Sequence, residues 1–200
     1  MDNAESAWIA SAQKGDDQAF EKLVEAYQRP VFNLCYRMLG DSYEAEDAAQ
    51  EAFLRAYKNI KRYDPNRSFA TWLLSIASHY CIDQIRRRRM QIVSLDAIPG
   101  DGETIPDDLP TPEAALRQSQ EQHNMQELLN TLSPLDRSAV VMYYWHECSY
   151  EEIAQALSLT ISAVKSRLHR ARRQLAESWQ KKQSTQSFTV ERKRHESPAF

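Results

Sequence analysis

A stretch rich in proline, glycine and acidic residues divides this 200-residue chain into two parts. Residues 96–112 hold four of the eight prolines and two of the four glycines, and they contain no lysine or arginine. Such a segment has too few apolar groups to offset the entropy that ordering would cost. The sequence therefore predicts two folded domains joined by an acidic flexible linker, which we place at residues 91–112.

The apolar residues on both sides of this linker repeat with the period of an α-helix. Phe20, Leu23 and Tyr27 share one helix face by their spacing, and no segment alternates like a strand. Pro30 predicts a helix boundary, because proline lacks the amide proton and restricts the residue before it. We therefore expect an all-α fold of two small helical domains. The expected parts are an N-terminal extension (1–15), a first domain (16–90), the linker, a second domain (113–182) and a disordered tail (183–200).

Several classes of protein are excluded by what the sequence lacks. Cys35, Cys81 and Cys148 are widely spaced, which fits neither a disulfide framework nor a structural zinc site. No signal peptide and no run of about 18 apolar residues is present, so we expect a cytoplasmic protein that does not insert into a membrane. None of the glycine-rich phosphate loops or hydrolase and metalloprotease motifs occurs. We therefore expect no enzymatic activity, no catalytic residue, no cofactor and no metal.

Positive charge is concentrated in two places although the whole chain carries a formal charge of −3. Residues 161–200 contain ten basic and three acidic side chains, a net charge of +7. In the otherwise neutral first 90 residues, four consecutive arginines run from Arg86 to Arg89. Two basic patches separated by an acidic segment predict two contacts with a polyanion.

The segment SYEEIAQALSLTISAVKSRLHRARRQL, residues 149–175, has the pattern of a helix-turn-helix. Ser149 and Glu152 have capping-box spacing, and Thr160 is placed to cap a second helix. That second helix is apolar on one face and basic on the other, as expected of a helix that enters the major groove of DNA. At position 158, where such turns often have glycine for a positive φ, this chain has serine. The candidate DNA contacts are Lys165, Ser166, Arg167, His169, Arg170 and Arg173.

The first domain mixes basic and aromatic residues around the loop KRYDPNRS, residues 61–68. Aromatic rings stack on unpaired bases while cations follow the phosphate backbone, so this mixture suits single-stranded DNA. Phe69 and Trp72 have the helical spacing of core residues and favour packing. Tyr63 lies in the polar loop without a periodic partner, which leaves an exposed stacking role and a packed role equally open.

Taken together, these motifs resemble the sigma-70 family of bacterial RNA polymerase initiation subunits, in particular the short extracytoplasmic-function (ECF) group with regions 2 and 4 only. The resemblance covers about residues 16–178, with EAEDAAQEAFLRAY, FATWLLSIASHYCIDQIRRRR and LSPLDRSAVVMYYW among its motifs. It implies binding to core polymerase at the clamp helices of the largest subunit and at the flap. It also implies binding to promoter DNA, opening of the −10 element and inhibition by an anti-sigma factor.

The resemblance also implies roles for individual residues. His79 occupies a position where many relatives have asparagine, and imidazole cannot offer the paired donor and acceptor of an amide. The basic helix of the second domain would read the −35 element, with Arg167 and Arg173 on phosphates. The implied core-binding residues are Asp47, Gln50, Glu51, Phe53 and Arg55. The implied −10 residues are Lys61, Arg62, Tyr63, Asn66, Arg67, Trp72, His79, Asp83 and Arg86.

A stand-alone helix-turn-helix regulator is the alternative that the sequence leaves open. It would explain the second domain equally well, with the first domain serving for sensing or dimerisation. It would give no purpose to the acidic helix face or to a loop suited to unpaired bases.

Overall fold

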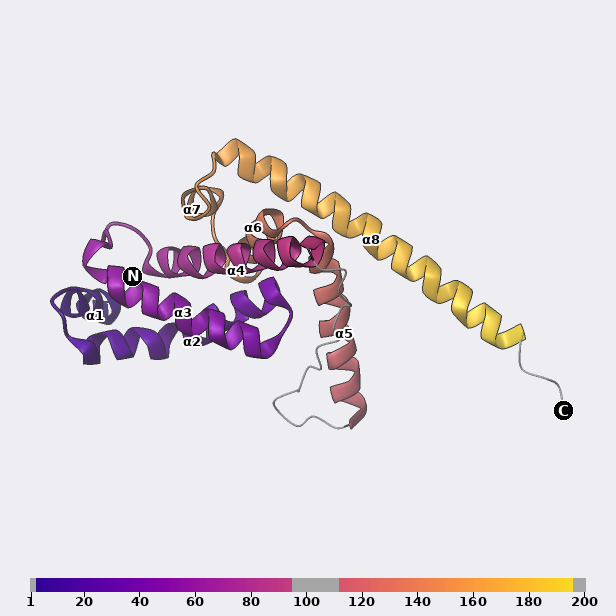
Figure 1. Ribbon diagram of the computed structural model, residues 1–200, viewed down its shortest axis with the longest axis horizontal. Helices are drawn as coiled ribbons and strands as arrows, with labels where there is room; N and C mark the ends of the chain where they lie inside the picture. Colours follow the sequence, from indigo (N-terminus) through magenta and orange to yellow (C-terminus); the bar gives the residue numbers. More distant parts are fainter. Residues whose placement is uncertain (1–2, 95–111, 196–200) are drawn as a thin grey trace.

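The computed structural model describes residues 3–94 and 112–195, and the part of the linker at 95–111 lies outside these residues. All regular structure in the described residues is helical (Figure 1). The helices are α1 (Asn3–Gln13), α2 (Asp17–Leu39), α3 (Ser42–Asn59), the 3-10 turn η1 (Ile60–Arg62), α4 (Phe69–Ser94), α5 (Pro112–Thr131), α6 (Pro134–Trp145), α7 (Tyr150–Ala156) and α8 (Ile161–His195).

The first domain is a bundle in which α2, α3 and α4 pack on one another and α1 closes one end. Small residues of α3 allow this close packing: Ala45, Ala48, Ala52 and Ala56 are fully buried. Asp16 and Asp41 accept backbone hydrogen bonds at the starts of α2 and α3, as expected of N-cap residues. The all-α fold with two helical domains is thus confirmed.

Helix α2 runs through Pro30 instead of ending there. The predicted boundary is wrong because the apolar face continues across the proline: Leu23 precedes it, Val31 and Leu34 follow it, and all three are completely buried. Burial of these side chains outweighs the roughly 3 kcal/mol that an interior proline costs. The helix ends instead at Gly40, whose φ of 84° closes it in the left-handed conformation.

Helices occur in two described segments where the sequence analysis expected none. Residues 3–13, expected as an extension, form α1, whose Ile9 and Ala12 are buried against the first domain. Gln13 Nε2 donates to the carbonyl oxygens of Ile60 and Tyr63 at 3.1 and 2.8 Å. At the other end, α8 continues past residue 182 to His195, because no proline or glycine occurs until Pro198.

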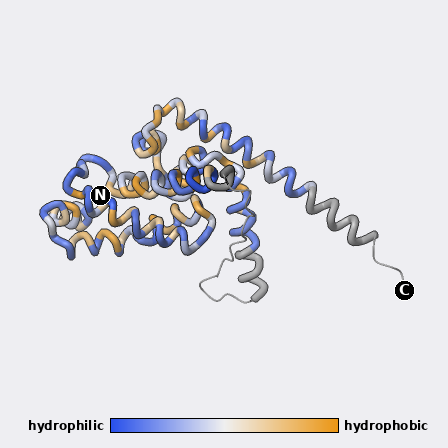
Figure 2. Tube along the Cα trace, in the orientation of Figure 1, coloured by the Kyte–Doolittle hydropathy of each residue, from blue (hydrophilic) through white to orange (hydrophobic). Residues whose placement is uncertain are grey.

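The second domain consists of α5 to α8, with α8 extending far beyond the rest of the molecule (Figure 1). Its core is formed by α6, α7 and the first half of α8, where Met142, Ile153, Val164 and Leu168 are buried. The coloured part of α8 consists mostly of hydrophilic residues (Figure 2). Among the described residues, no helix is both long enough and apolar enough to cross a bilayer.

Candidate nucleic-acid and polymerase interfaces

The predicted helix-turn-helix forms from the expected local interactions. Ser149 Oγ accepts a hydrogen bond from the Glu152 amide at 3.1 Å, and Glu152 Oε2 accepts one from the Ser149 amide at 2.9 Å. Thr160 Oγ1 caps α8 by accepting from the Ala163 amide at 3.1 Å. Both helix starts therefore follow the sequence pattern, and α8 buries its apolar face, which includes Val164 and Leu168.

Ser158 adopts a φ of 55° in the turn between α7 and α8, where related turns often use glycine. We expect Ser158→Gly to raise the free energy of unfolding by up to about 1 kcal/mol. Relief of the left-handed conformation gains roughly 1–2 kcal/mol, and the extra freedom of glycine in the unfolded chain offsets part of it. Urea unfolding measures this change. The matched control is Ala176→Gly, in the exposed interior of α8, which should destabilise by about 1 kcal/mol. Destabilisation by both variants would contradict the strain argument.

The outward face of α8 presents a row of basic and polar side chains. Lys165, Ser166, His169, Arg170 and Arg173 are all exposed. Lys165 Nζ lies 5.6 Å from the centre of the Tyr150 ring, which restricts its position at the start of the helix. Arg173 Nε lies 3.5 Å from Glu177 Oε1, a surface pair that solvent weakens. These five predicted contacts therefore lie on one solvent-exposed face of α8.

Arg167 is the exception among the predicted contacts of α8. Its Nη1 donates to Asp136 Oδ1 of α6 at 2.8 Å, and both side chains are largely shielded from solvent. Asp136 also accepts from Ser133 Oγ at 2.6 Å. Arg167 thus joins α8 to α6 within the domain, which leaves it less available for a phosphate than its exposed neighbours.

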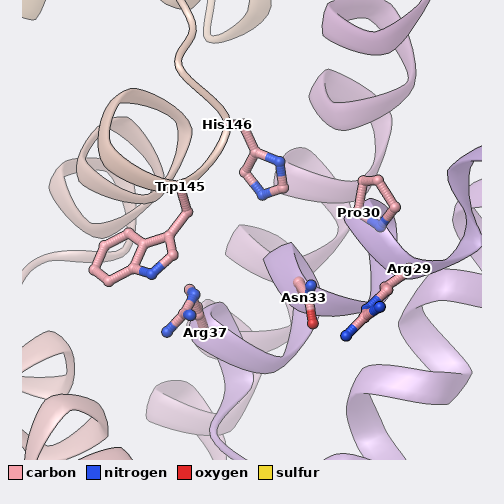
Figure 3. A pocket seen from close by; sticks show the side chains of 6 residues that line it. All are labelled: Arg29, Pro30, Asn33, Arg37, Trp145 and His146. Atoms are coloured by element: carbon pink, nitrogen blue, oxygen red, sulfur yellow. The ribbon is translucent and has the colours of Figure 1, made fainter.

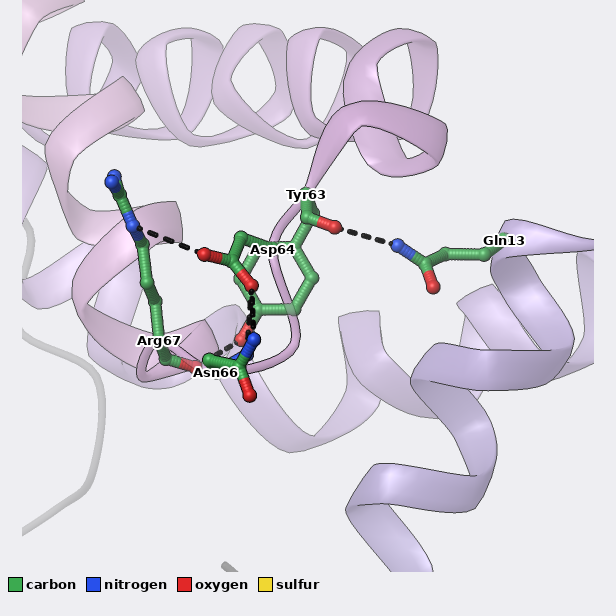
Figure 4. Close-up of polar contacts among 5 residues, drawn as sticks. All are labelled: Gln13, Tyr63, Asp64, Asn66 and Arg67. Atoms are coloured by element: carbon green, nitrogen blue, oxygen red, sulfur yellow. Dashed lines mark hydrogen bonds and ion pairs between the residues drawn. The ribbon is translucent and has the colours of Figure 1, made fainter.

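The loop at 63–68 resolves the two roles that the sequence left open for Tyr63. The side chain is only 4% exposed and packs against Phe69 and Trp72, with ring centres 5.4 and 4.9 Å away. Its hydroxyl donates to the Arg67 carbonyl oxygen (Figure 4). Burial is the main cause that raises the pKa of Tyr63 to about 12. In this arrangement the ring is a packing residue and is not free to stack on a base.

The exposed part of this loop is a tight turn organised by Asp64. Its Oδ1 accepts from the amide and side-chain nitrogens of Asn66 at 3.0 and 2.9 Å (Figure 4). Pro65 follows Asp64, the residue order that a turn favours. Asn66 and Arg67 remain exposed, as do Lys61 and Arg62 in η1. Four of the predicted −10 residues therefore surround one exposed loop.

The remaining predicted −10 residues lie along one side of α4. Trp72 is half-buried, while His79, Asp83 and Arg86 are exposed at a spacing that places them on one helix face. His79 Nδ1 lies 2.8 Å from the Ser75 carbonyl oxygen. When Nδ1 carries the proton and donates to that oxygen, Nε2 faces outward as an acceptor.

The predicted polymerase-binding residues of α3 separate into two groups. Asp47 and Gln50 are exposed and face away from the bundle. Glu51 Oε1 instead accepts from Arg55 Nε at 2.7 Å, and the Arg55 guanidinium lies 4.8 Å from the centre of the Tyr80 ring. Phe53 is half-buried against the core. Arg55 is also exposed, but these two contacts hold its guanidinium in place.

Three apolar residues that the sequence analysis did not select share this outer face. Tyr43, Leu54 and Tyr57 are 67%, 53% and 46% exposed, large values for side chains of their size. Together with Asp47 and Gln50 they follow a helical spacing, and we call these five residues the α3 stripe. Leu54 and Tyr57 fall outside the periodic alanine positions that form the buried face of α3. This spacing is the sequence signal that could have predicted their exposure. An exposed apolar patch with polar members is typical of a protein-binding surface.

The two domains contact each other next to the exposed loop. Thr71 Oγ1 of α4 donates to Glu152 Oε1 of α7 at 2.9 Å. In the amide orientation that suits its neighbours, the Gln155 oxygen accepts from Arg67 Nη1 and Nε at 3.2 and 3.1 Å. On the far side, buried Arg137 of α6 donates from Nη1 to the Met38 carbonyl oxygen at 2.5 Å. The helix-turn-helix therefore covers part of the predicted −10 surface.

A helical bundle with an exposed apolar stripe, joined to a helix-turn-helix with a basic outer face, is the arrangement expected of a two-domain transcription protein. Comparison with known proteins shows to which family of such proteins the chain belongs. The model for sigma-70 region 2 matches residues 23–90, and the model for sigma-70 region 4 matches residues 122–175. The ECF RNA polymerase sigma factor SigW of Bacillus subtilis (strain 168) is 36% identical over 173 residues, which cover 84% of this chain and 92% of that protein. The chain belongs to the ECF group of the sigma-70 family.

Solved structures show the same fold. CnrH, in complex with the cytosolic domain of CnrY, has a TM-score of 0.67 and 22% sequence identity, covering 89% of this chain and 98% of that one. The Bartonella quintana sigma factor RpoE, in complex with the anti-sigma factor NepR, has a TM-score of 0.64 and 21% identity, covering 79% and 94%. The stand-alone regulator is not favoured, because sigma-70 family models match both domains.

Proposed function

We propose that this protein binds core RNA polymerase through the α3 stripe and directs it to promoters by reading two DNA elements. In this proposal the exposed face of α8 reads the −35 duplex, and the exposed loop with the outer side of α4 opens and holds the −10 strand. The observation that carries the proposal is the presence of three separate exposed surfaces, two suited to DNA and one to protein. The protein acts by binding alone, in the cytoplasm.

The contact between the two domains implies that they separate when both elements are bound. A −35 and a −10 element lie roughly 25 base pairs apart, about 85 Å at 3.4 Å per base pair. In the structure, Gln155 of the helix-turn-helix touches Arg67 of the −10 loop directly. Residues 95–111 join α4 to α5, and 17 residues span at most about 60 Å. Together with the length of the domains, that reach is sufficient for the separation.

We infer that inhibition of this sigma factor by an anti-sigma factor would act on the same surfaces. The structural neighbour RpoE was solved in complex with its anti-sigma factor NepR. An inhibitor protein of this chain would need to cover the α3 stripe or to stabilise the contact between the domains. Either mode would block one of the three surfaces that the proposal requires.

Charge reversal on the α3 stripe is expected to reduce binding to core polymerase at least thirtyfold. The double variant Asp47→Lys/Leu54→Glu removes an exposed anchor and reverses a charge, and central interface residues are often worth 2 kcal/mol or more. Binding of labelled protein to purified bacterial core polymerase measures this loss. Glu25→Lys, on the exposed side of α2, is the matched control and should bind as the unmodified protein does. Equal binding by the double variant would show that α3 is not the docking helix.

A further inference from the structure

A cavity of about 210 Å³ lies between the two domains, where α2 passes the end of α6 (Figure 3). One wall is formed by Arg29, Asn33 and Arg37, which stand four residues apart and so share a face of α2. The other wall is formed by Trp145 and His146, with the histidine ring facing the α2 side chains. The cavity exists only while the domains are in contact.

The cavity walls are positively charged and contain no carboxylate. Arg29 and Arg37 contribute two guanidinium groups, and neither takes part in an ion pair among the described residues. The Arg37 guanidinium lies 4.3 Å from the centre of the Trp145 ring, which fixes its position at the edge of the cavity. The end of α6 contributes a partial negative charge of about one half, which two full positive charges outweigh.

Two buried polar atoms at this cavity have no hydrogen-bond partner within the described part of the chain. They are Arg37 Nε and His146 Nε2. Leaving a buried polar atom without a partner is unfavourable, so a ligand that accepted hydrogen bonds from these nitrogens would stabilise the site. Burial and the charge of Arg37 lower the pKa of His146 to about 4, and burial lowers the pKa of Arg37. With a pKa of about 4, the His146 imidazole is neutral at pH 7, so it can offer one N–H to a ligand while the two arginines supply the positive charge.

The volume of the cavity and the positions of its hydrogen-bond donors indicate which kind of anion would fit. A volume near 210 Å³ is below the roughly 300–1,000 Å³ of sites that enclose drug-sized ligands. Donors approach from two opposite walls, with guanidinium groups on one side and imidazole on the other. A tetrahedral phosphate group offers acceptor oxygens in several directions, which suits donors on two walls, and guanidinium groups are well suited to bind it.

We propose that this cavity between α2 and α6 binds a phosphate group, either free inorganic phosphate or the phosphate of a small ester. Because both domains form the walls, the closed arrangement is the one that binds, and an occupied cavity stabilises it by mass action. This site goes beyond the promoter-recognition proposal and does not depend on it. It assigns a role to Arg29 and Arg37 of α2, which belong neither to the α3 stripe nor to the two proposed DNA-binding surfaces.

Isothermal titration calorimetry of the full chain tests this site with inorganic phosphate and, in a second arm, glucose 6-phosphate. Sodium chloride is added to keep the ionic strength constant. Nonspecific attraction of anions to arginine is then screened equally in both arms. We expect saturable binding with one site. Arg37→Gln and His146→Leu, one from each wall, should each weaken it at least tenfold. Lys22→Gln, an exposed lysine of α2, removes the same charge outside the cavity and should bind as the unmodified protein does.

Arg29→Gln covers the case in which Arg37→Gln or His146→Leu fails to fold, because Arg29 is exposed and its loss leaves the core intact. It should also weaken phosphate binding, with an unchanged circular dichroism spectrum. Tighter binding of glucose 6-phosphate than of phosphate supports an ester as the natural ligand, and equal binding supports free phosphate. Absence of heat with both probes, or equal binding by Arg29→Gln and Lys22→Gln, would overturn the proposal.

Discussion

Alanine at both Lys165 and Arg170 is expected to weaken binding of the polymerase holoenzyme to its −35 element by roughly 2–6 kcal/mol, at least thirtyfold. Both side chains are exposed on the outer face of α8, and neither takes part in an ion pair among the described residues. A basic side chain that reaches guanine in the major groove contributes about 1–3 kcal/mol to discrimination between bases, and independent contacts add. Affinity is measured on promoter duplex and on duplex with a scrambled −35 element.

Arg173→Ala serves as the comparison for this prediction, because Arg173 is assigned to the phosphate backbone. Its loss should weaken binding similarly on both duplexes and reduce the slope of log affinity against log salt by about one. The Lys165→Ala/Arg170→Ala variant should instead lose the difference between the two duplexes. A double variant that still distinguished promoter from scrambled duplex at full affinity would contradict the assignment of α8.

Tyr63→Ala is expected to lower the free energy of unfolding by about 3–5 kcal/mol, as other large-to-small changes of buried aromatic residues do. The ring is packed between Phe69 and Trp72, so its removal leaves a cavity in the first domain. Tyr63→Phe keeps the ring and loses one hydrogen bond to the Arg67 carbonyl oxygen, worth roughly 0.5–1.5 kcal/mol. Urea unfolding of both variants measures these differences.

The same variants distinguish a packed tyrosine from one that stacks on DNA. Tyr63→Phe should open the −10 element to the same extent as the unmodified protein in a permanganate footprint. An exposed stacking residue would give the opposite pattern, in which Tyr63→Ala retained its stability and lost promoter opening. That result would contradict the packed position of the ring.

Local sequence signals predicted the helix-turn-helix well because its determinants are close in sequence. Ser149 and Glu152 cap each other across three residues, and Thr160 caps the helix that begins at the next residue. The period of Val164 and Leu168 determined which face of α8 is buried and, by exclusion, which basic residues are exposed. Each of these relations can be read in one or two helical turns.

The remaining features depend on partners that are distant in sequence. The Tyr63 carbonyl oxygen accepts a hydrogen bond from Gln13, 50 residues earlier, and the Tyr63 ring packs on two rings of the following helix. Arg167 is held by Asp136, 31 residues away, which no helical period indicates. Contact between the domains links Arg137 to Met38 across 99 residues. Tertiary packing determines whether these side chains are buried or paired. A local pattern along the sequence carries no information about contacts so distant.

Run-off transcription with purified bacterial core polymerase tests the central claim most directly. A pool of promoter-length fragments is transcribed with and without the protein, and the start sites are sequenced. We predict new discrete starts that share two upstream elements, lost in the Asp47→Lys/Leu54→Glu variant and retained in Glu25→Lys. An absence of new starts, together with salt-sensitive binding to duplex DNA without polymerase, would contradict the account.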